Sequence, residues 1–149
     1  MEIRCSESLL NSLYEYCRSC YPQEACGFVI GDKLSGGTTL TVRRFAPIGN
    51  SSPFPNDRFD MNPAELAALL VHTPQERLLG IYHSHPHAPP IPSELDLQTA
   101  WHTLPTYWIV SLCGPERPET AIYRWLPDDD KQKRLHRIRG SLIVTNGDD

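Results

Sequence analysis

Two histidines, one residue apart, close a short apolar stretch in the middle of this chain. The segment Leu78 to Ser84 is almost wholly apolar, which predicts a buried strand, and His83 and His85 stand at its end. Side chains two residues apart on a strand point to the same face. If the segment is a strand, both imidazole rings can therefore meet at one point at its end and bind one divalent metal ion.

A second polar pair follows after a proline-rich loop. Ser93 and Asp96 come directly after the run His87 to Pro92, and the fixed φ angles of its prolines reduce the entropy lost when the loop is ordered. His83, His85 and Asp96 then supply three protein ligands. A catalytic zinc site differs from a structural one because its fourth tetrahedral position stays open for water. The pattern favours a hydrolase centre.

The second pair also has a purely structural interpretation. Ser93 and Asp96 match the Ser-x-x-acid pattern of a helix N-terminus, in which the serine hydroxyl caps the first turn. This interpretation predicts a helix over Ser93 to His102 and needs no metal. It leaves His83 and His85 unexplained, and the capping and metal-binding roles are compatible.

The size of the chain indicates one domain. It has 149 residues, of which 40% are hydrophobic and 21% charged, typical of a globular domain with a substantial core. We expect residues 1–149 to form a single domain, with about 128–149 as a peripheral C-terminal segment. The longest apolar runs are far too short to cross a bilayer, so we expect no membrane partner.

Charge and cysteine content narrow the partners and the compartment. The net charge is −4, and the basic run Lys131 to Arg139 is preceded by three aspartates. Because binding to nucleic-acid phosphates needs a patch of Lys and Arg, we expect no nucleic-acid partner. The N-terminus lacks the pattern of a secretory signal, and five cysteines, an odd number, fit a reducing environment. We therefore expect a cytoplasmic protein.

Helix and strand patterns alternate along the rest of the chain. Ser6 matches an N-cap for a helix ending at Pro22, and Asn62 matches one for a helix after the loop Pro47 to Asp60. The segments Leu135 to Arg139 and Leu142 to Thr145 are either a terminal hairpin or a peripheral tail. Strands are predicted over 25–31, 38–46, 78–84, 107–113 and 120–126, the first two as a hairpin. This order predicts an α/β domain with a central mixed β-sheet flanked by helices.

Cys17 and Cys20 form a single Cys-x-x-Cys pair. Such a pair is compatible with redox chemistry or with a second metal. It falls on the predicted first helix in register with Leu9, Leu13 and Tyr16, which favours small apolar side chains facing the core. The sequence has no second Cys-x-x-Cys to complete a structural zinc site.

The motifs resemble those of the JAMM (MPN+, Mov34/MPN/PAD-1) zinc metalloprotease family, in which an upstream Glu is followed by His-x-His-Pro and then by a Ser and an Asp. His83, His85 and Asp96 match the zinc ligands of that motif. Ser93 matches the serine of that motif, and Glu24 matches its upstream glutamate. Without the resemblance, Glu24 is equally well explained as a solvated surface charge. The likeness covers most of residues 5–126. It implies a single-domain MPN/JAMM fold, which is cytidine-deaminase-like, with one catalytic Zn²⁺ ion.

By this resemblance Glu24 and Ser93 are the catalytic side chains. Glu24 would take a proton from the attacking water and pass it to the leaving amine, while Ser93 would donate a hydrogen bond to the oxyanion. The Zn²⁺ ion would polarise the scissile carbonyl, and a bound metal lowers the pKa of water from about 15.7 toward about 7.

The resemblance also implies a substrate class. Active family members cleave peptide or isopeptide bonds at the C-terminus of ubiquitin-like proteins. This compact chain is most similar to bacterial members that trim residues after the Gly-Gly of a ubiquitin-like (ThiS/MoaD-type) sulfur-carrier protein. Trimming would expose the glycine for thiocarboxylate formation in the synthesis of sulfur metabolites such as cysteine. Arg58 and Phe59 lie near the position at which related enzymes bind the substrate tail. The sequence leaves open whether the protein forms a homodimer.

Three alternatives are weighed beside this function, in addition to a phage-tail or cell-wall peptidase of the JAMM class, which no secretion signal in the sequence supports. One is a JAMM isopeptidase of the deubiquitinase type. Another is a non-catalytic MPN interaction scaffold, but such members typically lose metal ligands, and here none is missing. The third is a zinc deaminase, whose chemistry expects His-x-Glu and Pro-Cys-x-x-Cys, and neither motif occurs in the sequence.

Overall fold

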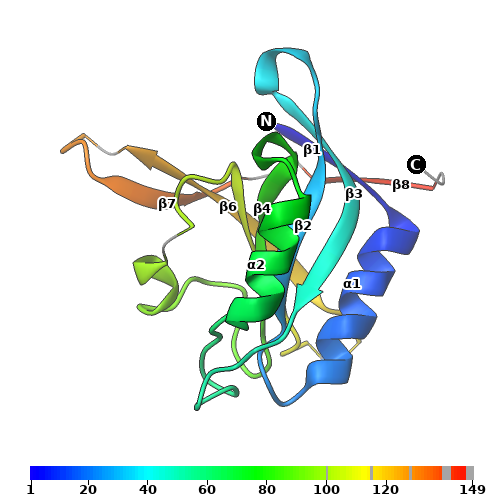
Figure 1. Ribbon diagram of the computed structural model, residues 1–149, viewed down its shortest axis with the longest axis vertical. Helices are drawn as coiled ribbons and strands as arrows, with labels where there is room; N and C mark the ends of the chain where they lie inside the picture. Colours follow the sequence, from blue (N-terminus) through cyan, green and yellow to red (C-terminus); the bar gives the residue numbers. More distant parts are fainter. Residues whose placement is uncertain (100, 115, 128, 139–141, 147–149) are drawn as a thin grey trace.

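A mixed β-sheet forms the centre of the protein (Figure 1). The computed structural model describes residues 1–99, 101–114, 116–127, 129–138 and 142–146. Within these residues the strands run in the order β7-β6-β5-β4-β2-β3-β1-β8 across the sheet. Their bounds are β1 Glu2–Ser6, β2 Cys26–Lys33, β3 Thr39–Ile48, β4 Leu78–His85, β5 Thr106–Ser111, β6 Glu119–Pro127, β7 Lys133–Arg137 and β8 Leu142–Thr145.

Two α-helices pack on this sheet, and both begin where the sequence predicts. Helix α1 spans Glu7–Cys20, and the hydroxyl of Ser6 accepts a hydrogen bond from the amide of Leu9 at 3.2 Å. Helix α2 spans Pro63–His72, and the Asn62 side chain accepts from two amides of its first turn. Neither helix is long and apolar enough to cross a membrane, and the described residues hold no other helix that is. The described part of the chain also contains three short 3₁₀ segments, η1 Ser35–Gly37, η2 Gln75–Arg77 and η3 Asp96–Gln98.

Strand β4 is central and carries the paired histidines to its C-terminal end. It pairs antiparallel with β2 on one side and parallel with β5 on the other, and every residue of β4 is buried. A strand covered on both faces needs a continuous apolar sequence, which Leu78 to Tyr82 provides. The predicted β2–β3 hairpin is confirmed as an antiparallel pair.

The hydrophobic core has two parts, because successive side chains of the central strands point to opposite faces. On one face Val29, Tyr82 and Trp108 pack with α1. On the other face their neighbours Phe28, Ile81 and Tyr107 pack with two leucines of α2, which lies across β2 and β4 in Figure 1. The sheet therefore lies between two helices, which confirms the predicted α/β architecture.

The sheet is curled, so that its two edge strands approach each other. Strands β7 and β8 lie at opposite ends of the strand order. Only four residues separate Arg137 from Leu142 in the chain, so the two strand ends lie within about 18 Å of each other. The two segments are strands as the sequence suggests, but they do not form a terminal hairpin. Strand β7 pairs with β6, and β8 pairs in parallel with β1, a strand that the sequence pattern missed.

The predicted helix over Ser93 to His102 is wrong. The described part of this segment contains only the 3₁₀ turn η3, and residue 100 lies outside the described residues. Leu95 and Leu97 are about half exposed (44% and 50%), so a helix here has no buried apolar face to offset its nucleation cost. The side chain of Thr99 also accepts a hydrogen bond from the amide of Trp101, which favours a turn.

Candidate metal centre

The last residues of β4 place two imidazole rings side by side in the protein interior. His83 is completely buried and His85 is 6% exposed. Their Nε2 atoms lie 3.1 Å apart. The period of two along the strand therefore brings the rings together, as the sequence predicts.

A carboxylate from the turn η3 closes the triangle. In Asp96, Oδ1 lies 3.0 Å from Nε2 of His83, and Oδ2 lies 3.0 Å from Nε2 of His85. The orientation of Asp96 is fixed by Ser93, whose amide donates to Oδ2 at 2.8 Å and whose hydroxyl accepts from the Asp96 amide at 3.1 Å. This reciprocal pair is a capping box. The structural role of Ser93 and Asp96 is thus present together with the convergence on the histidines.

These three residues fit one metal ion. Around a tetrahedral zinc with bonds of about 2.0 Å, ligand atoms lie about 3.3 Å from one another. Here the two Nε2 atoms lie 3.1 Å apart, and each lies 3.0 Å from a different carboxylate oxygen of Asp96, close to that value. Two imidazoles and one carboxylate are the ligand types of catalytic zinc sites with an open position.

The two rings are oriented in different ways. Nδ1 of His85 lies 2.9 Å from the carbonyl oxygen of Pro89, so an Nδ1–H donated there leaves Nε2 with a lone pair for a metal. Nδ1 of His83 is buried and has no hydrogen-bond partner among the described residues. Its ring is instead stacked on Phe59 (centroids 4.8 Å apart, planes at 27°) and meets Tyr107 edge to face at 5.4 Å.

The electrostatics of the triangle favour the metal-binding state of His83 and of Asp96, but not that of His85. Burial lowers the pKa of His83, which keeps its ring neutral. Burial pushes the pKa of Asp96 upward, but hydrogen bonds to His83 and His85 outweigh it and hold the pKa below its usual range. For His85, burial lowers the pKa, but the Asp96 carboxylate and the Pro89 carbonyl raise it overall. An ionised carboxylate thus faces two imidazoles across a small gap.

Glu24 lies at the edge of the same site and is not a solvated surface charge. It precedes β2, is only 7% exposed, and lines a cavity together with His85 and Ser93. Burial, with smaller contributions from the charges of Asp96 and Asp57, raises its pKa to about 7, against an opposing contribution from His85. A carboxyl group with that pKa exchanges a proton readily at neutral pH.

Two contacts that the sequence did not reveal hold Glu24 in place. Ser84, which points to the opposite face of β4 from the histidines, accepts a hydrogen bond from the Ala25 amide at 2.8 Å. Asn50 organises the loop that covers Glu24: its Nδ2 lies 3.0 Å from the Glu24 carbonyl oxygen and 3.0 Å from that of Arg58. The alternation of side chains along a strand predicts which face of the sheet the Ser84 side chain points to, but no local sequence pattern indicates that it bonds to the Ala25 amide.

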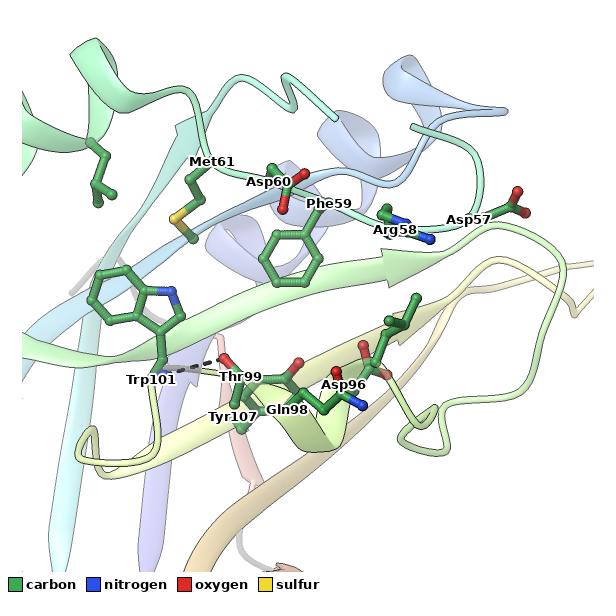
Figure 2. Close-up of a pocket in the computed structure, with 12 residues that line it drawn as sticks. Asp57, Arg58, Phe59, Asp60, Met61, Asp96, Gln98, Thr99, Trp101 and Tyr107 are labelled. Carbon is green, nitrogen blue, oxygen red and sulfur yellow. Dashed lines mark hydrogen bonds between the residues drawn. The ribbon is translucent and has the colours of Figure 1, made fainter. Parts of the chain in front are cut away.

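Two cavities meet at the metal centre. The larger, of about 420 Å³, is shown in Figure 2 and is bounded on one side by Asp96 and on the other by aromatic and apolar side chains, among them Phe59, Met61 and Trp101. The smaller, of about 210 Å³, is lined by Glu24 and Ser93. The lining of both cavities includes residues of the loop 47–60, which the sequence places at the surface.

The Cys-x-x-Cys pair belongs to the core. Cys17 is completely buried in the cluster beneath α1, and Cys20 packs against that cluster. Burial raises the pKa of Cys17 to about 12, so this thiol is not reactive. All five cysteines are free thiols in the structure.

Comparison with known proteins decides the family. Residues 6–126 match the model of Prok-JAB, the prokaryotic homologs of the JAB domain. The chain belongs to this family. The JAMM resemblance and the JAB/MPN fold are therefore confirmed, and the protein is a JAMM-type metallopeptidase, a hydrolase.

Relatives and solved structures agree with that assignment. The chain is 29% identical over 128 residues to a desampylase of Haloferax volcanii, covering 85% of this chain and 86% of the relative. It is 29% identical over 117 residues to a CysO-cysteine peptidase of Mycobacterium tuberculosis, covering 78% and 77%. A solution structure of a Desulfitobacterium hafniense protein superposes with a TM-score of 0.78 at 25% identity, covering 97% of this chain and 94% of the other.

Proposed function

We propose that this JAB-domain protein is a zinc-dependent peptidase that hydrolyses the bond after the C-terminal Gly-Gly of a ubiquitin-like sulfur-carrier protein of the ThiS/MoaD type. The released glycine carboxylate would then be available for thiocarboxylate formation in sulfur-metabolite synthesis. The observation that carries the proposal is a buried carboxyl group, Glu24, next to two histidines and an aspartate spaced for one ion. The names of the relatives, desampylase and CysO-cysteine peptidase, support the choice of a small ubiquitin-like protein.

In this proposal His83, His85 and Asp96 hold one Zn²⁺ ion. When bound, the ion supplies a Lewis acid for the scissile carbonyl and lowers the pKa of water. The three ligands leave a fourth tetrahedral position free. Stacking of Phe59 on His83 and the bond from His85 to the Pro89 carbonyl keep both rings turned toward the common point.

Glu24 and Ser93 carry the proton and hydrogen-bond steps. Water adds to the glycine carbonyl carbon, the carbon–nitrogen bond breaks, and Glu24 accepts the proton of the water and gives it to the departing amine. In the metal-free protein burial raises the pKa of Glu24 to about 7, and a raised pKa favours return of the proton to the amine. The Ser93 oxygen accepts from the Asp96 amide through a lone pair, which leaves its O–H available to donate to the developing oxyanion.

The larger cavity is the proposed path of the substrate tail. An extended Gly-Gly segment has no side chains and fits between Phe59 on the loop side and Tyr107 and Trp101 on the sheet side (Figure 2). Asp96, one of the three proposed ligands, is part of the lining of this cavity. The scissile carbonyl would therefore arrive beside the metal with its leaving nitrogen directed toward Glu24.

The proposed compartment is the cytoplasm. Cys5, Cys17 and Cys26 are buried free thiols, Cys20 and Cys113 are also unpaired, and free thiols persist in a reducing environment. A sulfur-carrier protein and its activation belong to the same compartment in this proposal.

The test is a cleavage assay with a defined series of carriers. Purified zinc-loaded protein is incubated with candidate carriers extended beyond Gly-Gly, and the products are weighed by mass spectrometry, with Glu24→Gln as the control. We expect a product ending in Gly-Gly from the wild type and none from the variant. Cleavage of only a carrier joined to a lysine side chain would support the deubiquitinase-type alternative, and no cleavage of any carrier with zinc bound would refute the proposal.

A further inference from the structure

The smaller cavity at the metal centre is acidic. Its lining includes the carboxylates of Glu24 and Asp57, and none of the described residues around it is a lysine or an arginine. Burial is the main reason for the raised pKa of Glu24, and the charge of Asp57 makes a smaller contribution in the same direction. The two carboxylates are therefore close enough to interact. The cation next in sequence, Arg58, lies over the ring of Phe54 at 5.3 Å and lines the larger cavity instead.

Under the proposed function, this cavity lies on the side where the amine leaves. Glu24 delivers the proton to the leaving amine, and Glu24 lines the smaller cavity but not the larger one. The departing group therefore moves past Glu24 toward Asp57 and His87. The ring of His87 meets that of Tyr21 edge to face at 5.1 Å, which supports the outer wall.

We infer that Asp57 makes this enzyme discriminate against leaving groups that carry a carboxylate next to the scissile amine. A single amino acid as leaving group brings its α-carboxylate two bonds from the departing nitrogen, into the field of Asp57, where like charges repel. The zinc ion attracts the same carboxylate, but its charge does not depend on residue 57. A lysine side chain has no such group, and the first residue of a longer peptide has a neutral amide there. The inference rests on the proposed function and ranks its substrates: Asp57 favours carriers with a lysine or a peptide of two or more residues after Gly-Gly over carriers with a single amino acid there.

A matched pair of substrates isolates this charge. One carrier is extended after Gly-Gly by a single alanine with a free carboxylate, and the other by the same alanine as its carboxamide. The ratio of kcat/KM for amide over acid is measured with the zinc-loaded full chain at about pH 8, at low salt and at about 0.5 M salt. The variants are Asp57→Asn and, as a control that removes one charge elsewhere, Glu76→Gln in η2, at the end of β4 away from the site.

The ratio of amide over acid should be about threefold to tenfold higher in the wild type than in Asp57→Asn, the size expected for like charges several Å apart in a partly solvated site. The zinc ion attracts the carboxylate in both proteins, so its charge cancels in this comparison. The difference should shrink at high salt, and Glu76→Gln should keep the wild-type ratio. A ratio in Asp57→Asn equal to that of the wild type would overturn the inference while leaving the proposed function in place. Cleavage of neither substrate by zinc-loaded protein would overturn both.

Discussion

The hydroxyl of Ser84 is expected to stabilise the protein and to position Glu24. It accepts a hydrogen bond from the Ala25 amide at 2.8 Å, and the Ser84 amide donates back to the Ala25 carbonyl at 3.0 Å. Both residues are fully buried, so no water can replace the hydroxyl. Ala25 follows Glu24 directly in the chain. Ser84→Ala should therefore weaken the fold and also displace Glu24, the proposed general base.

The size of the effect follows from the group left without a partner. Leaving one buried amide unsatisfied costs about 1 to 3 kcal/mol. In a chain of 149 residues, each kcal/mol shifts Tm by about 2 to 4 °C, so Ser84→Ala should lower Tm by about 2 to 12 °C. A displacement of about 1 Å at a reacting group can cost about 100-fold in rate, so kcat should fall more than stability alone explains.

Urea unfolding and amide hydrogen exchange measure these effects. The matched control is Ser12→Ala, because the Ser12 hydroxyl donates to the Ser8 carbonyl on the exposed face of α1 and its loss should change stability by less than about 0.5 kcal/mol. Exchange of the Ala25 amide should be faster in Ser84→Ala than in Ser12→Ala. A loss of stability in Ser84→Ala as small as in the control, with Ala25 exchange unchanged, would refute the role given to this bond.

Three further predictions concern the same site. Phe59→Ala should weaken zinc binding by up to about tenfold in a chelator competition, because His83 loses its stacking partner, whereas Phe54→Ala, at an exposed residue of the same loop, should not. In metal-free protein, the free energy of unfolding should fall by up to about 3 kcal/mol as pH rises from 4.5 to about 7, because the raised pKa of Glu24 favours the folded state only while this group is protonated. In Glu24→Gln, urea unfolding should show no such fall with pH. Asn50→Asp keeps the side-chain acceptor but removes the N–H that donates to the Glu24 carbonyl. The substitution should lower the free energy of unfolding by about 1 to 3 kcal/mol and make proteolysis of the loop 47–60 faster.

Local rules account for much of the candidate site because its proposed ligands lie on a strand and on a 3₁₀ turn. The convergence of His83 and His85 follows from the period of a strand, and the burial of that strand follows from its apolar sequence. The capping pattern predicted that the Ser93 hydroxyl caps the following turn, and in the structure it accepts a hydrogen bond from the Asp96 amide. Strand geometry and a capping box each need only a few neighbouring residues.

The rest depends on contacts between distant segments, which no local pattern specifies. The helix expected after Ser93 does not form, because Leu95 and Leu97 find no surface to pack on. The burial of Glu24 depends on a loop that Asn50 folds over it, across 26 positions of sequence. Likewise, the five residues of β1 form a strand because they pair with β3 and with the distant β8, and these pairings have no local sequence signal.

The most direct test of the account is the zinc stoichiometry of the wild type and of two variants, measured by equilibrium dialysis at neutral pH. We expect one tightly bound ion per chain in the wild type and in Glu24→Gln, whose side chain is not among the three that converge, and loss of that ion in His85→Gln. Zinc retained by His85→Gln, or absent from the wild type, would contradict the assignment of the metal centre.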